Sequence, residues 1–487
     1  MMGLKEKHFK QHPTLCLEDL VPQDNFYREV EAKLDLNFVR ELVKDMYCWW
    51  NGRPSIDPVV FFKLQVIMFF EGIRSERQLM EIVSMRCDHR WYIGYDFDEP
   101  VPDHSSLTNI RDRYGFEVFQ KFFEHIVELC IEAGLVWGKE FYFDGSMVKA
   151  NADYDRQIPK FYWQAIQAHL QQLFDTTPPQ PERSRPDLVG RYDGTKPVVE
   201  KSRYRKKSDY WVSPIDPYAT RVGSLRRLGY RLHYVVDGGK TRIILGCLVT
   251  PSAIQDNTPM LDLAWWVRFR WHTQPDIAVG DSRYGTVENI VGLETNGIRA
   301  FTPLMTQVLE KKHKGYPRSM FTYDPENNCY ICPQGKTLPF RHTDKGKYHV
   351  YRAMGKDCRE CEVRSRCTKT KNGRKISHSI FKDYLDRVAA YHQTEAYKKA
   401  MRKRQVWVEP PFGEVKQWHQ GERFRLRGIR KVNIEALIQA AGLNIKRLLK
   451  YAGKHQFTCP PAQENQAALA VPRPLLDIRH PLLVSIE

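Results

Sequence analysis

The sequence predicts a mixed α/β fold that carries an all-helical N-terminal region and a cysteine-rich insertion. Apolar residues recur at helical spacing over the first 135 residues, β-rich segments with turn signals follow from residue 140, and five cysteines crowd into residues 329–367. Hydrophobic residues make up 42% of the 487 residues, which is ample material for a core. That composition excludes a disordered, a collagen-like and a small disulfide-stapled protein.

The N-terminal region contains several helix signals. A cap followed by a proline at 57–58 predicts a helix that ends at Phe70, and the capping box at 75–78 starts a second helix. Ser105 is expected to cap a third helix, and the apolar run 116–133 continues at helical spacing up to a glycine. These helices are expected either to read DNA in a helix-turn-helix manner or to serve packing or dimerisation.

The mixed core is expected to alternate strands with helices. One hairpin is signalled by Asp237-Gly238-Gly239 between two β-rich runs. A helix should follow Thr286, another should start at Pro410, and Asn433 is expected to cap a last helix through Leu449. The expected strands cover residues 140–149, 230–236, 242–250, 275–279 and 298–302.

Two segments are expected to interrupt this core, and a loose tail is expected to end it. Residues 153–228 contain a Pro-rich stretch at 176–186, and residues 305–395 are polar, Gly-rich and basic. The expected domains are therefore a helical N-terminal domain (1–135), the first part of the core (136–304, with insertion 153–228), the cysteine-rich insertion (305–395), the last part of the core (396–452) and the Pro-rich tail (453–487).

The charge of the chain is uneven. The formal net charge is +17, yet residues 1–110 hold 13 Lys or Arg against 18 Asp or Glu. Residues 201–240 hold 10 against 3, and residues 351–430 hold 21 against 9. Two basic blocks favour a polyanion such as nucleic acid as partner, although a basic surface kept for solubility is the simpler alternative. The N-terminus lacks the apolar region of a secretory signal, and we expect an intracellular protein that does not span a membrane.

Three acidic residues end or begin predicted elements. Asp144 ends one strand, Asp281 ends another, and Glu409 precedes Pro410-Pro411 at a helix start. Phosphoryl transfer on nucleic acid commonly uses two divalent cations, which need carboxylate oxygens on rigid elements. The alternatives are a turn-forming role for Asp144 and a surface or capping role for Glu409, with Glu414 as the competing glutamate.

The cysteine cluster offers ligands for a metal. In an intracellular protein such a cluster favours metal over disulfides, and four thiolates suffice for a tetrahedral zinc site. Five cysteines compete for the four places, and a reduced, metal-free cluster is the alternative. The candidates are Cys329, Cys332, Cys358, Cys361 and Cys367.

Five motifs occur in the order found in one family of DNA-processing enzymes. They are FYFDGSMVKANA (141–152), GYRLHYVVD (229–237), LVTPSAIQDN (248–257), VGDSRYGT (279–286) and VEPPFGEVK (408–416). From about residue 15 to 450 the chain resembles bacterial insertion-sequence transposases of the DDE superfamily. This resemblance implies an RNase H-like catalytic core behind a helical N-terminal transposase domain. It also implies that Asp144, Asp281 and Glu409 are the catalytic residues, which bind two Mg²⁺ ions.

The resemblance extends to residues around the triad. Lys416 matches a lysine that follows the glutamate by seven positions, and Tyr284 matches the tyrosine after the second aspartate. The family also has an arginine four residues before the glutamate, where this chain has Gln405 with Arg404 adjacent, and Arg402 replaces an expected tyrosine. His233 and Asp256 match recurrent family positions. The insert of related transposases favours Cys332, Cys358, Cys361 and Cys367 as the zinc ligands.

These observations predict an Mg²⁺-dependent DNA transposase that cuts insertion-sequence ends and transfers the strands to target DNA. Its expected partners are double-stranded DNA, as terminal inverted repeats and as target, and a second copy of the chain in the DNA complex. Lys416, Tyr284, Arg423, Arg425 and Arg427 are expected to contact DNA, with a solvated charged face as the alternative for the arginines. The expected location is the cytoplasm, at the nucleoid. The rival functions are an RNase H-fold nuclease without strand transfer and a non-catalytic, zinc-bearing DNA-binding protein.

Overall fold

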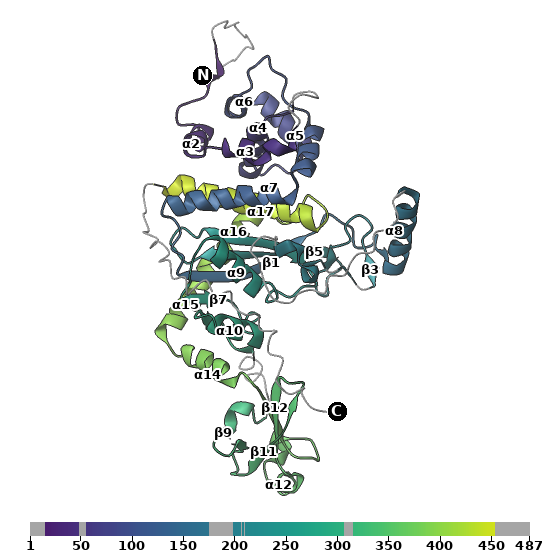
Figure 1. The fold of residues 1–487 in the computed structure, drawn as a ribbon, viewed down its shortest axis with the longest axis vertical. Helices are drawn as coiled ribbons and strands as arrows, with labels where there is room; N and C mark the ends of the chain where they lie inside the picture. The colour runs from purple at the N-terminus through teal and green to yellow at the C-terminus, as the bar shows by residue number, and fades with distance from the viewer. Residues whose placement is uncertain are drawn as a thin grey trace, which may run out of the picture.

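The computed structural model describes residues 15–47, 55–174, 198–205, 207–208, 210–305 and 315–452. It is elongated, with the N-terminal helices at one end, a mixed sheet in the middle and a small antiparallel sheet at the other end (Figure 1). The Pro-rich stretch 176–186 and the tail 453–487 lie outside the described residues. Within the described ranges, no helix combines the length and the apolar character needed to cross a membrane.

The N-terminal helices form as their sequence signals predict, with one correction. Asp57 accepts a hydrogen bond from the Val59 amide at 2.8 Å and caps α4, a helix that is buried on nearly all sides. At the last helix Asp103, two residues before the predicted Ser105, accepts from the Ser105 amide and is the cap. The helices are α1 (Leu17–Leu20), α2 (Phe26–Lys33), α3 (Phe38–Val43), α4 (Pro58–Phe70), α5 (Glu76–Met85), α6 (Cys87–Ile93) and α7 (His104–Glu132).

A six-stranded mixed sheet forms the centre of the molecule. Strand β5 pairs antiparallel with β1 and β6, whereas β1, β7 and β8 run parallel to one another, so the order is β6-β5-β1-β7-β8 with the short β4 also on β5. This mixed α/β arrangement behind helical N-terminal elements confirms the predicted fold class and is consistent with an RNase H-like core. The strands are β1 (Glu140–Lys149), β4 (Thr220–Arg221), β5 (Leu228–Asp237), β6 (Ile244–Pro251), β7 (Ile277–Val279) and β8 (Arg299–Phe301).

The long helix α17 (Ile429–Tyr451) lies beside α7 and packs on β6, between the N-terminal helices and the sheet (Figure 1). The prediction that Asn433 caps this helix is wrong, because α17 already begins at Ile429. The buried Asn433 amide instead accepts from the Val249 amide at 2.7 Å and donates to the Val249 carbonyl at 3.0 Å. Asn444 makes the same pair of bonds with Ile244. The two asparagines thus satisfy backbone groups on the outer edge of β6.

Further helices connect the core strands. Thr286 accepts from the Asn289 amide and caps the helix predicted to follow it. The catalytic candidate Glu409 is the first residue of a helix that is docked on the sheet by the stacked rings of Phe412 and Tyr234. These helices are α9 (Met260–Arg270), α10 (Val287–Glu294), α14 (Lys382–Tyr391), α15 (Glu395–Trp407) and α16 (Glu409–Trp418).

Two smaller units extend from the core. The first carries α8 (Lys160–Phe174) and the strand pair β2 (Ile158–Pro159) and β3 (Trp211–Val212), whereas the 3₁₀ turns at Val198–Glu200 and Ser202–Tyr204 pack on the main core. The second is an antiparallel sheet of order β13-β12-β11-β10-β9 with its own small apolar core. Its elements are β9 (Thr322–Asp324), β10 (Cys329–Ile331), β11 (Thr337–Asp344), β12 (Tyr348–Arg352), α12 (Gly355–Arg359), α13 (Arg364–Cys367) and β13 (Lys375–Ser379).

Candidate active site and cysteine cluster

The pairing of β1 with β7 brings the two candidate aspartates to equivalent positions. Tyr142 pairs with Val279 in the parallel ladder, and Asp144 and Asp281 each follow their paired residue by two positions. Because side chains alternate along a strand, residues two positions apart point the same way. Asp144 lies inside β1, where it pairs with Tyr234, so the prediction that it ends this strand is wrong. Asp281 lies two residues beyond the end of β7, and the β1–β7 pairing brings the two residues to the same part of the sheet although they are 137 positions apart in sequence.

An arginine connects the first aspartate to the glutamate. Nη1 of Arg404 lies 3.3 Å from Oδ2 of Asp144, and its Nη2 lies 3.7 Å from Oε1 of Glu409. Burial raises the pKa of Asp144 to about 6, the Gly145 amide and Arg404 oppose the rise, and the charges of Asp281 and Glu409 add to it. The structure thus brings the three predicted carboxylates into one electrostatic cluster.

The cluster fits divalent cations in the chemistry of its donors. Carboxylate oxygens are the ligands that Mg²⁺ prefers. A cation would favour the ionised form of Asp144, whose pKa is raised mainly by burial and further by the charges of Asp281 and Glu409. As the side chains stand, no group of three His, Cys, Asp or Glu residues in the described part of the chain is arranged to hold a metal ion. The guanidinium of Arg404 lies between Asp144 and Glu409, where its positive charge offsets the repulsion between the two carboxylates.

Glu414, the competing glutamate, has a different role. Its Oε1 lies 2.6 Å from Nζ of Lys446 and its Oε2 lies 3.1 Å from Nη2 of Arg447. Both partners belong to α17, so Glu414 ties α16 to that helix. Glu409 lies instead 3.7 Å from Nη2 of Arg404, and its side chain is 57% exposed.

The auxiliary residues differ in how accessible they are. Lys416 donates from Nζ to Oγ of Ser146 at 2.7 Å, which places an ammonium group on the same face of β1 as Asp144. Tyr284 is 2% exposed, so a direct contact with DNA would require its ring to be uncovered. Among the arginines after α16, Arg423 and Arg427 are exposed.

Arg425, which is expected to contact DNA, makes internal contacts in the structure. Its Nη1 lies 2.8 Å from Oε1 of Glu76, a buried residue at the start of α5, and Arg111 of α7 binds the same carboxylate. Two hydrogen bonds from the Arg425 and Leu426 amides to Glu435 hold the segment in place. Arg425 therefore joins the N-terminal helices to the segment that follows α16.

Arg404 is the site residue that the sequence pattern located least well. The family spacing points to Gln405, whereas the structure brings the preceding residue to the carboxylates. Arg404 lies on α15, which ends at Trp407, whereas Glu409 begins the next helix, α16. Arg402, in place of the expected tyrosine, is 76% exposed and lies 3.9 Å from Glu395.

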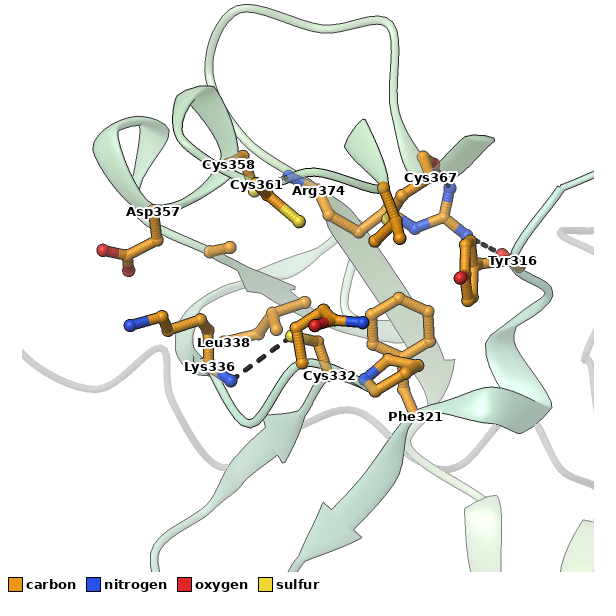
Figure 2. A pocket seen from close by; sticks show the side chains of 14 residues that line it. Tyr316, Phe321, Cys332, Lys336, Leu338, Asp357, Cys358, Cys361, Cys367 and Arg374 are labelled. Carbon is orange, nitrogen blue, oxygen red and sulfur yellow. Dashed lines mark hydrogen bonds between the residues drawn. The ribbon is translucent and has the colours of Figure 1, made fainter. Parts of the chain in front are cut away.

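Four of the five clustered cysteines line one small cavity. Figure 2 shows Cys358, Cys361 and Cys367 on one side and Cys332 on the other. The Lys336 amide donates to Sγ of Cys332 at 3.3 Å, and the Arg374 amide donates to Sγ of Cys358 at 3.4 Å.

The fifth cysteine lies apart, and the donor set suits zinc. Cys329 is buried on β10 and does not line the cavity. Burial raises the pKa of Cys367, and the neighbouring Cys358, Cys332 and Cys361 add to that rise. Thiolates that repel one another and accept amide hydrogen bonds fit Zn²⁺ in donor type, although the sulfurs do not close on a common centre in this arrangement.

The raised pKa of Asp144 predicts a pH-dependent effect on stability. A carboxyl whose folded pKa of about 6 exceeds its ordinary 3.8 destabilises the fold once it ionises, so stability falls as the pH rises through that window. We expect metal-free Asp144→Asn protein to be more stable than wild type at pH 7.5 by about 2–3 kcal/mol, and equally stable below pH 4. Urea unfolding with chelator at both pH values measures this, and a less stable variant at pH 7.5 would contradict it.

Two family comparisons match parts of the chain. The family described as "Transposase DDE domain" matches residues 331–449, which include the four cavity cysteines, Arg404, Glu409 and most of α17. The family described as "Transposase domain (DUF772)" matches residues 15–113, which include α1 to α6 and the start of α7. No curated protein matches the chain.

Proposed function

We propose that this chain, which belongs to the insertion-sequence DDE transposases, cuts DNA at the ends of an insertion sequence and transfers the freed strands to target DNA. The observation that carries the proposal is the meeting of three acidic residues from distant segments at the β1–β7 edge: Asp144 and Asp281 follow one ladder pair, and Arg404 links Asp144 to Glu409. Transposases act on DNA, so the substrate class follows from the family.

The catalytic carboxylates would hold two Mg²⁺ ions. When bound, these ions stabilise the attacking and leaving oxygens of an in-line displacement at phosphorus. Asp144 projects from within the rigid strand β1, Asp281 lies two residues beyond the end of β7, and the helix that begins at Glu409 is docked on β5. Lys416 supplies positive charge on the Asp144 face, where it can attract the phosphate backbone.

The proposed partners are double-stranded DNA and a second copy of the chain. The DNA would comprise the terminal inverted repeats of the element and the target site. A dimer would let two copies act on the two ends of one element. The exposed basic residues of the segment after α16 would contribute phosphate contacts, and the cysteine cavity would hold one structural zinc ion.

A cleavage and joining assay tests this function. Purified protein, Mg²⁺, a DNA with the matched element end and a target plasmid should give nicked ends and then joined products. Nicked ends without joined products would indicate a nuclease that lacks strand transfer. Binding without any cut would favour a non-catalytic DNA-binding protein, as would flanking genomic DNA that lacks terminal inverted repeats.

Salt dependence separates the surface arginines from the internal one. We expect the double variant Arg423→Ala/Arg427→Ala to weaken binding to all DNA sequences about equally and to reduce the slope of log affinity against log salt by about 2. Arg425→Ala should instead lower the unfolding temperature with little change in slope, because it leaves the buried Glu76 with one partner fewer. An unchanged slope in the double variant would mean that these arginines only face solvent.

A further inference from the structure

A buried carboxylate outside the triad contacts both segments that carry the catalytic aspartates. Asp256 is 6% exposed and follows the β6 strand. Its Oδ2 lies 2.6 Å from Nη1 of Arg283, and its Oδ1 accepts from Nη1 of Arg231. Arg231 also donates from Nε to the Ser252 carbonyl at 3.0 Å, so this second arginine is fixed at both ends of its guanidinium.

Asp256 also packs against the residue that follows Asp144. A Cβ atom placed on Gly145 would lie 3.0 Å from Oδ1 of Asp256 and 3.2 Å from Nδ1 of His233. Contacts this short mean that a side chain at this position would require Asp256 or His233 to shift. One buried carboxylate therefore packs close to the backbone beside Asp144 and binds the arginine beside Asp281.

The loop that carries Arg283 is tightly constrained. Oδ1 of Asp281 accepts from the Arg283 amide at 2.7 Å. A Cβ on Gly280 would lie 2.7 Å from Cβ of Tyr284, and a Cβ on Gly285 would lie 2.1 Å from the Pro303 carbonyl oxygen. With both glycines packed this closely, the loop fixes the position of Arg283 relative to Asp281.

Arg283 nevertheless keeps most of its surface in solvent. Its side chain is 64% exposed, compared with 21% for Arg231, although both bind the same carboxylate. An ion pair whose guanidinium is mostly in water stabilises a fold only weakly, so stability alone does not account for Arg283. A guanidinium held at one nitrogen still offers further donors to an anion.

We propose that Arg283, held by Asp256, forms a phosphate-binding subsite beside Asp281 that grips the backbone of the DNA strand next to the cleaved bond. Three carboxylates alone would repel that backbone, whereas Asp256 carries two arginines and so adds a net positive charge at the rim of the cluster. A fixed guanidinium would also orient the strand, because it binds phosphate in a preferred plane. This subsite rests on the proposed function, since it presumes a DNA substrate at the triad.

Binding experiments with neutral phosphates test the subsite without any cleavage. End DNAs that each carry one methylphosphonate linkage are titrated with protein in Ca²⁺, and the affinity is plotted against the position of the linkage. In wild type, one position near the cleavage site should weaken binding about tenfold. In Arg283→Gln that position should have no further effect, while binding to unmodified DNA should be about tenfold weaker and the salt slope should fall by about 1.

Further variants separate positioning from charge. Arg283→Lys should keep the salt slope but lose much of the position-specific effect, because an ammonium group lacks the planar fork. Asp256→Asn should reduce the position-specific effect as Arg283→Gln does. Arg299→Gln is the matched control, since Arg299 is an exposed arginine on the neighbouring β8 and its guanidinium lies 5.8 Å from the centre of the Phe301 ring; its methylphosphonate profile should match wild type.

The outcomes are distinguishable. The subsite would be overturned if folded Arg283→Gln gave the same methylphosphonate profile as wild type. It would also be overturned if no single linkage position weakened binding of the wild-type protein. If Asp256→Asn fails to fold, the Arg283 variants decide alone. A protein that shows the expected binding profiles but never cuts in Mg²⁺ would support the subsite and count against the proposed catalysis, so the two failures differ.

Discussion

Asp281→Ala is expected to lower the rate of DNA cleavage by several orders of magnitude while leaving DNA binding intact. Asp281 follows β7 through Gly280, and its position relative to the ladder matches that of Asp144 on β1. Its carboxylate would help to hold both Mg²⁺ ions, and residues that act as one unit lose function together when any one of them is removed. The measurement is a single-turnover cleavage assay on matched end DNA with Mg²⁺.

Binding should survive this substitution because affinity comes mainly from basic side chains on phosphates. Removal of a carboxylate also lessens the repulsion of the DNA, so the affinity of Asp281→Ala should equal or exceed that of wild type. The Arg283 backbone loses its bond to Oδ1, yet its side chain keeps Asp256 as partner. A filter-binding titration in Ca²⁺ checks this half of the prediction.

Asp276→Ala is the matched control. Asp276 is an exposed acid at the opposite end of β7 from Asp281, just before the strand begins. The hydrogen bonds that Asp276 makes with Lys139 and Arg299 use its backbone. The control should cut at the wild-type rate. Wild-type nicking by Asp281→Ala would show that this aspartate is not catalytic, and a failure of wild type and of both variants to cut would favour a DNA-binding protein without chemistry.

Local signals in the sequence predicted the framework of the site well. Strand β1 covers the predicted residues 140–149, and helix α4 ends at Phe70 as predicted. These elements are specified by alternation, caps and turn residues that lie within a few positions of each other. The placement of the candidate aspartates, in contrast, depends on the pairing of β1 with β7, and Asp144 lies inside β1 rather than at its end.

Residues whose partners are distant in sequence were harder to predict. Asn433 carries the signal of a helix cap but binds β6, which is 184 positions away. Arg425 lies in a basic run that resembles a DNA contact, yet its partner Glu76 belongs to the N-terminal helices. Arg404 on α15 binds Asp144 on the distant strand β1. The partners of Asp256 are Arg231 on β5 and Arg283 after β7, so they depend on how the strands of the sheet are arranged. In each case the role of the residue is set by a partner that is distant in sequence, and the local sequence pattern is compatible with more than one role.

The second large effect is expected in the cysteine-rich sheet when the proposed zinc ion is removed. Among the described residues of this segment, the buried apolar cluster that is separate from the main core is small, with six members: Phe321, Tyr330, Leu338, Tyr351, Ala353 and Ile376. So small a core gives little stability by itself, whereas zinc binding by four thiolates contributes about 10 kcal/mol or more in small zinc domains. We therefore expect chelation to unfold this segment while the main core stays folded.

The cysteines themselves provide both the test and its control. Elemental analysis should find close to one zinc per chain in wild type. It should find much less in Cys361→Ser, because loss of the Cys361 sulfur leaves the cavity one ligand short. Cys329→Ser should keep its zinc, because Cys329 lies on β10 away from the cavity. Trypsin should cut rapidly between residues 315 and 381 in Cys361→Ser and in chelated wild type. It should cut this segment slowly in Cys329→Ser, because the basic residues of the segment become accessible only when the sheet opens. A metal-free insert that resists trypsin would show that the six-residue core suffices and that the cysteines are not ligands.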